Sequence, residues 1–262
     1  MHRQVGDKGG EATTLNNIGV VYSALGDKRK ALDYFEQSLP MHRQVGDKPG
    51  EATTLTSIGA VYADLGDKHK ALDYFEQSLP MHRQVGNKAM EAITLNNIGM
   101  IYADLGDKRK ALDYFEQSLP LRRQVGDKGG EATTINNIGS VYDALGDKRQ
   151  ALDYYEQSLP LLRQIGDWDH EAGSLNNIGG IYAANGDTKS ALRYFEQALA
   201  LRIQLGDRFG EVSTRWWIGT LHERANDHQL ALEQLEMTAN VAAQVNSPNE
   251  LAIRQMIEQL QQ

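Results

Sequence analysis

The residues of this chain that could do acid, base or metal chemistry recur at a fixed interval and do not converge on one site. His2, His42 and His82 lie 40 residues apart, so they are better explained as solvated helix residues than as ligands of one metal ion. Asp33 and Glu36 recur in the same way, which indicates an exposed charged face and not an acid and base pair in a pocket. We therefore expect no catalytic residue and no metal site.

Motifs of phosphate-binding and hydrolytic enzymes are also missing from the sequence. The glycine-rich segment 6–10 lacks the Gly-Lys-Ser/Thr ending of a phosphate-binding loop, and helix capping explains its composition. There is no Gly-x-Ser-x-Gly elbow, no His-Glu-x-x-His helix and no cysteine. The prediction is a protein that is not an enzyme and binds no cofactor.

Hydrogen bonding is the chemistry that the sequence favours, because pairs of asparagines recur at one position. A row of asparagines can donate to and accept from the backbone of an extended peptide, whatever its side chains. The pairs are Asn16 and Asn17, Asn96 and Asn97, Asn136 and Asn137, and Asn176 and Asn177. We expect at least some of them to contact a ligand. The alternative is that the second asparagine of each pair bonds to neighbouring helices and holds them in register.

The elements that must position these side chains are marked by a Gly-Asp pair every 20 residues, from positions 6–7 to positions 206–207. The pair changes only to Gly-Asn at 86–87 and to Asn-Asp at 226–227. Glycine tolerates the left-handed conformation that ends a helix, and aspartate accepts hydrogen bonds from the free amides of the next helix. The pattern predicts a series of helices.

Two such helices make one copy of a repeat of 40 residues, and the copies follow one another without insertions. In the first copy we expect helices at 8–25 and 28–45. The expected repeats are 6–45, 46–85, 86–125, 126–165, 166–205 and 206–245, joined in one solenoid in which neighbours bury each other's apolar faces.

Both ends differ from this pattern. Residues 1–5 match the tail of a second helix, so we expect the chain to begin in mid-repeat, as a fragment of a longer protein or a truncated gene product. Near the other end, Asn246 ends a helix and Ser247 is a candidate N-cap, with Pro248 in the first turn. This predicts a capping helix at 248–261.

The core of each repeat is predicted from an apolar stripe at helical spacing. The stripe of the first copy contains Ala12, Leu15, Ile18, Gly19, Tyr22 and Leu25, and its partner helix offers Ala31, Leu32, Phe35 and Leu39. Gly19 is expected where the two helices approach closely. Pro40 lies inside the second helix, where we expect a bend without a break.

In order and spacing, one set of residues resembles the signature of the tetratricopeptide repeat: Leu15, Ile18, Gly19, Tyr22, Gly26, Ala31, Phe35 and Ser38. The common family repeat has about 34 residues, so the longer version here is similar to kinesin light chain, LGN/Pins-type polarity adaptors and bacterial signalling proteins. The resemblance implies an all-α, right-handed superhelix of about 13 helices. Its first helices would line a concave groove that holds peptides or protein segments.

Variation among the first four copies indicates the same groove. In the first helices most differences fall in the columns of residues 13, 16, 17, 20, 23 and 24, on an arc of roughly 120° away from the apolar stripe. Drift after duplication is the alternative explanation, but the exposed second-helix residues Asp33, Glu36 and Gln37 did not drift. The candidate groove residues are Asn16, Asn17, Val20, Asp64, Asn96, Asn97, Met100, Asp104, Asn136, Asn137, Asp143, Asn176, Asn177 and Trp217.

The charge of the chain limits which classes of partner we expect. The formal net charge of −8 and the lack of basic runs argue against nucleic acid and membrane surfaces. Asp64, Asp104 and Asp143 make the groove acidic, which favours a neutral or basic, extended segment. We expect a cytoplasmic scaffold for such segments, within a larger multidomain signalling protein. A spacer that assembles into homo-oligomers by end-to-end stacking of its first repeat remains the alternative.

Overall fold

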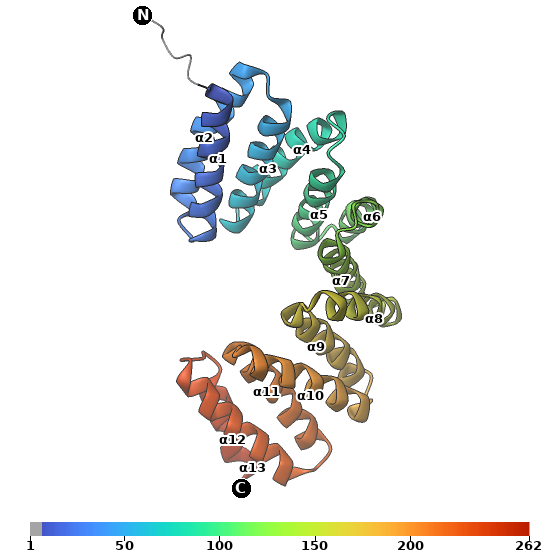
Figure 1. Ribbon diagram of the computed structural model, residues 1–262. Helices are drawn as coiled ribbons and strands as arrows, with labels where there is room; N and C mark the ends of the chain where they lie inside the picture. The colour runs from blue at the N-terminus through green and yellow to red at the C-terminus, as the bar shows by residue number, and fades with distance from the viewer. Residues whose placement is uncertain (1–6, 262) are drawn as a thin grey trace, which may run out of the picture. The chain divides into compact units, whose positions relative to one another are not determined.

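A computed structural model describes residues 7–261 of the chain and folds them into thirteen α-helices without a strand (Figure 1). The expected all-α class is confirmed. The helices are α1 (Lys8–Ala24), α2 (Lys28–Val45), α3 (Lys48–Asp64), α4 (Lys68–Gln84), α5 (Lys88–Asp104), α6 (Lys108–Val125), α7 (Lys128–Leu145), α8 (Lys148–Ile165), α9 (Trp168–Ala184), α10 (Thr188–Leu205), α11 (Arg208–Arg224), α12 (His228–Gln244) and α13 (Glu250–Leu260).

Packing divides the chain into two compact units, unit 1 (Met1–Asn137) and unit 2 (Ile138–Gln262), with the division inside α7. In unit 1, α1 pairs with α2, α3 with α4 and α5 with α6, and α1, α3 and α5 also contact one another in sequence. In unit 2, α9 pairs with α10 and α11 with α12, and α13 packs against α12. We call the odd-numbered helices α1 to α11 the first helices and their partners the second helices.

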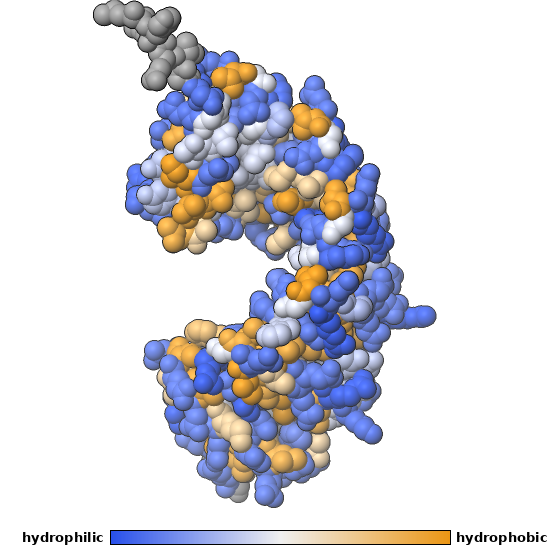
Figure 2. Space-filling view, viewed as in Figure 1, coloured by the Kyte–Doolittle hydropathy of each residue, from blue (hydrophilic) through white to orange (hydrophobic). Residues whose placement is uncertain are grey.

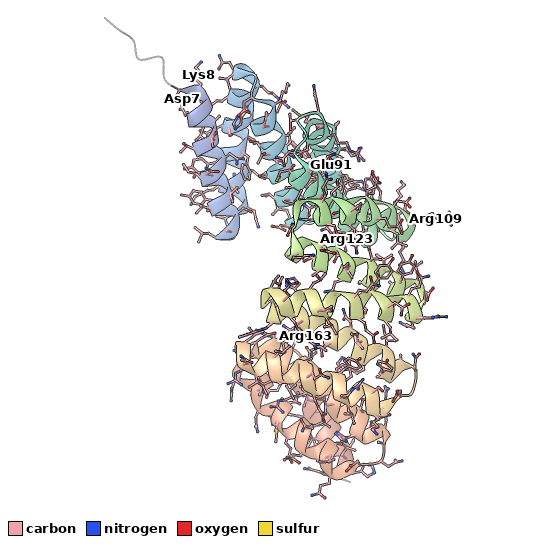
Figure 3. The ribbon with its side chains drawn as sticks, turned by 45° about the vertical axis from the view of Figure 1, so that its right-hand side comes forward. Asp7, Lys8, Glu91, Arg109, Arg123 and Arg163 are labelled. Atoms are coloured by element: carbon pink, nitrogen blue, oxygen red, sulfur yellow. The ribbon has the colours of Figure 1, made fainter. Side chains whose placement is uncertain are left out.

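The expected helix signals are present in the structure. Asp7 is the N-cap of α1, and its Oδ1 accepts from the backbone amide of Gly10 at 2.9 Å (Figure 3). Gly26 has a φ of +85°, and Asn226, which replaces glycine, has a φ of +59°. Glycine, which has no Cβ, adopts this left-handed conformation readily, and asparagine is the residue that most often replaces glycine there. The short turn between helices is therefore built locally.

The last helix begins later than expected. Helix α13 starts at Glu250, and Pro248 lies in the preceding turn. Asn249, not Ser247, is the N-cap, and it makes no capping hydrogen bond through its side chain. The hydroxyl of Ser247 instead accepts from the amide of Asn249 at 3.3 Å. The Ser-Pro pair thus forms a turn that directs the chain into α13.

Each helix pair has one glycine at its closest approach, and the first four pairs also have one buried serine there. A Cβ on Gly59 would lie 2.7 Å from the ring of Phe75, so only glycine fits there. The Ser38 hydroxyl donates to the carbonyl of Ala12 at 2.7 Å, which joins the pair through a buried hydrogen bond. Four second helices continue through their internal prolines, as expected. Leu25, by contrast, is 75% exposed and does not belong to the core.

The histidines are a second correction, because His42 and His82 are buried, with 2% and 0% of their surface exposed. His2 lies outside the described residues. The column of His42 lies where a second helix meets the next first helix, and Arg122 occupies the same column two repeats later. Nδ1 of His42 lies 2.7 Å from Oδ2 of Asp47, and Arg122 forms the corresponding ion pair with Asp127. Helical periodicity could not show that a neighbouring helix covers this column.

Candidate functional site

The first asparagine of each pair lies between consecutive first helices. Oδ1 of Asn96 accepts from Nδ2 of Asn137 at 3.1 Å and lies 3.2 Å from the hydroxyl of Thr134. Asn176 donates to the hydroxyl of Thr214 at 3.1 Å. We call these contacts, which join the column of Asn16 to the next first helix, interhelix ties. They favour the register interpretation, and they assign it mainly to the first asparagine of a pair.

The column of Asn16 is therefore the exception in the expected arc. Asn16 and Asn96 are buried, and Asn136 and Asn176 are half-buried. Thr56, which replaces asparagine in the second copy, lies 3.4 Å from the hydroxyl of Thr94 and forms the equivalent tie. This column faces the neighbouring first helix, so packing makes its side chains less accessible to a ligand.

The second asparagines are more accessible. Asn17 and Asn177 are exposed, while Asn97 and Asn137 are half-buried. Of these, Asn137 already donates to a tie. The side chain of Asn177 is hydrogen-bonded to the hydroxyl of Tyr155, so the amides of Asn17 and Asn97 are the ones best placed for a ligand.

A pocket of about 200 Å³ opens between α3 and α5 in unit 1, and it gathers four of the expected groove residues. We call it the α3/α5 pocket. Its lining is Ala60, Ala63, Asp64, Phe75, Asn97, Met100, Ile101 and Asp104. Phe75 and Ile101 are buried and form an apolar base, whereas Met100 is 48% exposed. A concave apolar surface with one amide and two carboxylates can hold a side chain and bond to the adjoining backbone.

The carboxylates of this pocket are neutralised by lysines that start the second helices. Asp64 forms an ion pair with Lys28, and Oδ2 of Asp104 lies 3.3 Å from Nζ of Lys68. Asp143 pairs in a similar way with Lys148, at 2.6 Å. These ion pairs offset the negative charge that the sequence predicts for the groove. Exposed pairs of this kind contribute little stability, so an incoming charge can displace them.

Sequence reasoning missed several contributors to the α3/α5 pocket. Lys28 and Lys68 are 36 residues from their acidic partners, and only their recurrence at the first position of the second helices could have singled them out. Phe75 was expected in the core of its own pair, but the same ring also forms the base of the pocket. Ala60 and Ala63 leave the space that a larger side chain in these columns would fill.

Buried glutamates position the first helices and were also missed. Glu51, in the column of Glu11, accepts from Arg43 and Lys48, each at 2.8 Å. Burial acts to raise the pKa of Glu51, but the hydrogen bonds from Lys48 and Arg43 outweigh it, so the pKa lies below its ordinary value. Glu91, at the start of α5 (Figure 3), has the same contacts with Arg83 and Lys88. The invariance of this column was the available signal.

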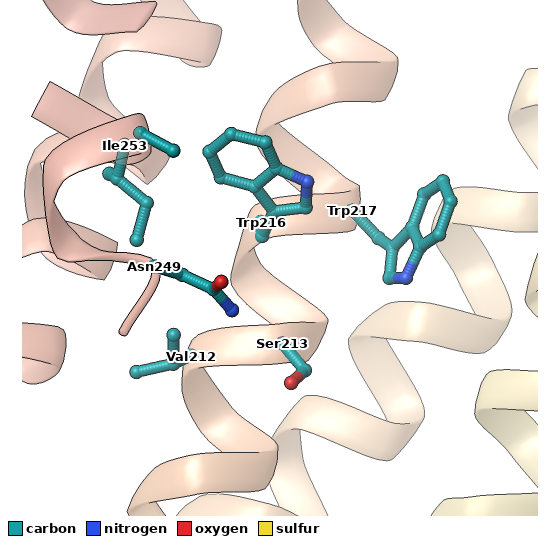
Figure 4. A pocket seen from close by; sticks show the side chains of 7 residues that line it. Val212, Ser213, Trp216, Trp217, Asn249 and Ile253 are labelled. Atoms are coloured by element: carbon teal, nitrogen blue, oxygen red, sulfur yellow. The ribbon is translucent and has the colours of Figure 1, made fainter. Parts of the chain in front are cut away.

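The remaining candidates lie apart from the α3/α5 pocket. Val20, on α1, is exposed. Trp217, on α11 in unit 2, is 43% exposed, and its ring stacks on Phe195 with centroids 6.1 Å apart. Trp216 points away from Trp217, toward α13 (Figure 4), and packs against the apolar cluster around Ile253.

The surface around these sites is mostly polar. In the space-filling view, hydrophilic side chains cover most of the visible face of each unit, and apolar side chains form smaller groups (Figure 2). Among the described helices, none has the length and apolar character needed to cross a membrane.

Comparison with known families agrees with the fold and the repeat. The family model of the tetratricopeptide repeat matches residues 1–44, 10–84, 90–164 and 170–244. The chain therefore belongs to the tetratricopeptide repeat family. Repeats of this family are typically non-catalytic scaffolds for protein interactions. No curated protein matches the chain.

Solved structures with the same fold are distant in sequence. BtubC (BKLC) from P. vanneervenii is 19% identical, with a TM-score of 0.74 over 84% of this chain and 92% of that one. A Rap protein complexed with Competence and Sporulation Factor is 16% identical, with a TM-score of 0.68 over 96% and 75%. A signal transduction ATPase with numerous domains (STAND protein) with a tetratricopeptide repeat sensor, from Pyrococcus horikoshii, is 15% identical, with a TM-score of 0.79 over 98% and 40%. The chain thus spans two fifths of the length of that ATPase.

Proposed function

We propose that this chain is a non-catalytic interaction module that holds an extended peptide or protein segment along its first helices. The observation that carries the proposal is the α3/α5 pocket, in which Asn97 and Met100 lie beside Asp64 and Asp104 over the ring of Phe75. The half-buried amide of Asn97 can bond to a peptide group, and the apolar base can receive the adjoining side chain. The Rap structure, which is complexed with a factor, supports this use of the fold by analogy.

The partner that we propose is neutral or weakly basic. A neutral segment leaves the ion pairs of Lys28 with Asp64 and of Lys68 with Asp104 intact. A basic side chain would have to compete with these lysines for the carboxylates. By analogy with the STAND protein, in which the tetratricopeptide repeat is a sensor, we propose that the module is part of a larger signalling protein. We also propose a cytoplasmic location for it.

Binding of a library of labelled nonapeptides, measured by fluorescence anisotropy, tests the proposal. For the tightest peptide, Asn97→Ala should weaken binding about tenfold, which corresponds to the loss of one hydrogen bond worth about 1.4 kcal/mol. Gln77→Ala is the matched control, because Gln77 carries an exposed amide on a second helix, and its one hydrogen bond within the described residues 7–261 goes to the carbonyl of Asp73. Equal affinities of wild type and Asn97→Ala, or an equal loss in the control, would contradict the proposal.

A second variant separates neutral from basic partners. Lys68→Met removes the lysine that pairs with Asp104. The affinity for a peptide with a central lysine should rise severalfold, because Asp104 is then free to pair with it. The affinity for the same peptide with a central leucine should stay unchanged. If both peptides respond alike, the carboxylate does not face the bound segment.

A further inference from the structure

The second pocket of note lies in unit 2, between α11 and α13, and has a volume of about 290 Å³ (Figure 4). We call it the α11/α13 pocket. We propose that it is a binding site for the aliphatic or aromatic side chain of an uncharged, extended peptide segment. It shares no residue with the α3/α5 pocket, so this proposal does not depend on the function proposed above.

The α11/α13 pocket exists because an interhelix tie is missing. Trp216 occupies the column in which Asn96 and Asn176 bond to the next first helix. Its bulky ring packs toward Ile253 on α13 instead. Helix α13 packs chiefly on α12, with Ile253 fully buried in their shared apolar cluster. The start of α13 is therefore not drawn onto α11, and a space remains between them.

The inner surface of this space is apolar. Val212 and Ile253 are buried in the described structure, with 2% and 0% of their surface exposed, and the ring of Trp216 forms a wall. An apolar side chain that enters the space removes its own surface and part of this wall from water. Such burial contributes roughly 25 cal/mol per Å² of apolar surface. Ala252, an exposed and small residue at the edge, leaves the entrance open.

Polar groups at the edge can bond to the backbone on either side of that side chain. Asn249 makes no capping bond for α13, and within residues 7–261 the structure gives its side chain no hydrogen-bond partner. Ser213, on the opposite side, is exposed, and its hydroxyl has no bond in the same range. One amide and one hydroxyl suit the donors and acceptors of a peptide backbone.

Charge selects an uncharged occupant. None of the residues that line the α11/α13 pocket is ionisable. The nearest carboxylates in sequence are already paired: Glu211 with Arg208 at 2.8 Å and with Arg215 at 2.9 Å, and Glu250 with Arg254 at 2.9 Å. A charged side chain would lose water in this site and gain no counter-charge.

The test uses acetylated and amidated heptapeptides Gly-Ser-Gly-X-Gly-Ser-Gly, with X as Leu, Phe, Ala, Lys or Glu, titrated into the whole chain. Calorimetry gives the affinity, and tryptophan emission reports on Trp216 and Trp217. We expect Leu and Phe peptides to bind at least tenfold more tightly than the Ala peptide, and the Lys and Glu peptides to bind no better than Ala. Equal affinities, or no binding up to millimolar concentration, would overturn the proposal.

Variants locate the binding. Ala252→Phe should fill the α11/α13 pocket and weaken binding of the Leu peptide at least tenfold, whereas Gln259→Phe, which places the same ring at an exposed position of α13, should not. Asn249→Ala should weaken all bound peptides severalfold and keep the preference for Leu over Ala. Circular dichroism checks that each variant is folded. Wild-type affinity in Ala252→Phe would contradict the site.

One further variant keeps the two proposals distinguishable. Asn97→Ala, in the α3/α5 pocket, should leave the affinity of the Leu heptapeptide unchanged. If Asn97→Ala weakens its binding and Ala252→Phe does not, the peptide binds in the α3/α5 pocket and the present proposal fails. If only Ala252→Phe weakens it, the α11/α13 pocket is a site in its own right, whatever becomes of the α3/α5 pocket.

Discussion

The α3/α5 pocket and the α11/α13 pocket open at opposite halves of the first helices. The former is lined by the second half of α3 and α5, from position 60 onward and from position 97 onward. The latter is lined by positions 212–217 of α11 and by the start of α13. Between α3 and α5 the contact of Thr56 with Thr94 closes the first half, and Trp216 makes no such contact. The column of Asn16 thus decides which half of the space between two neighbouring helices is open.

The two pockets also differ in charge. Lysine-paired carboxylates surround the first pocket, and the second is lined by uncharged residues. The first is made from columns that vary while the rest of the repeat stays constant. The second is made from two tryptophans that depart from the repeat in its last copy and from residues at the start of α13, which follows that copy. Substitutions at a few positions of an otherwise constant repeat are thus one way to create a binding surface. The end of the repeat array is another.

We expect the greatest loss of stability when a tryptophan replaces the asparagine of an interhelix tie. Asn96→Trp should destabilise the protein by about 2–4 kcal/mol, because the ring overpacks a buried site and leaves the side-chain amide of Asn137 without its acceptor. Asn97→Trp, one residue along and half-buried at the groove, should cost less than about 1 kcal/mol. Urea unfolding followed by circular dichroism measures both. Similar losses in the two variants would refute the role assigned to this column.

A smaller loss of stability is expected at Trp216, beside the α11/α13 pocket. Trp216→Ala should destabilise the docking of α13 by about 1–3 kcal/mol, because the ring is a partly buried part of the apolar cluster around Ile253. Trp217→Ala, whose ring is more exposed, should cost about 1 kcal/mol or less. Hydrogen exchange of the α13 amides should speed up in the first variant and change little in the second. Faster exchange in both would show that Trp216 has no special role.

The smallest expected effect is a pH dependence of the tie between α3 and α5. Nε2 of His82 lies 3.0 Å from the hydroxyl of Thr56, and burial lowers the pKa of His82 below 6.5, against the opposing influence of Glu91. The unfolded chain therefore protonates His82 more readily than the folded chain does. The contribution of neutral His82 to the free energy of unfolding is complete above pH 6.5, and it is lost as the pH falls toward the pKa of His82 in the folded protein. The free energy of unfolding should therefore decrease between pH 7 and pH 5.

Leucine, which the fourth copy has at the corresponding Leu162, provides the control for this effect. His82→Leu should remove the decrease in melting temperature between pH 7 and pH 5. The carboxylate of Glu91, close to His82, cannot produce the same decrease. Its pKa is lowered in the folded protein, so the stability that it contributes is lost only as the pH falls below its ordinary pKa of 4.5. An unchanged pH profile in His82→Leu would assign the decrease to other groups.

Much of the fold followed from local signals in the sequence. The Gly-Asp pair predicted the helix ends, because the left-handed glycine and the N-cap aspartate act within a few residues. The site could be predicted only in part. The varying columns identified Asn97, Met100, Asp64 and Asp104, which do share a pocket. The lysines that neutralise the acids and the burial of Asn96 depend on helices far away in the sequence, so helical periodicity could not reveal them.

The amino-acid sequence was enough to predict the helices, their pairing into repeats and the family, because these depend on backbone conformation and on spacing within 40 residues. The tertiary structure decided which faces are covered. It buried His42 and His82, exposed Leu25, and turned the column of Asn16 inward. The physical reason is that burial depends on the neighbouring helix, and two helices with the same local pattern can meet different neighbours. The two pockets differ for that same reason.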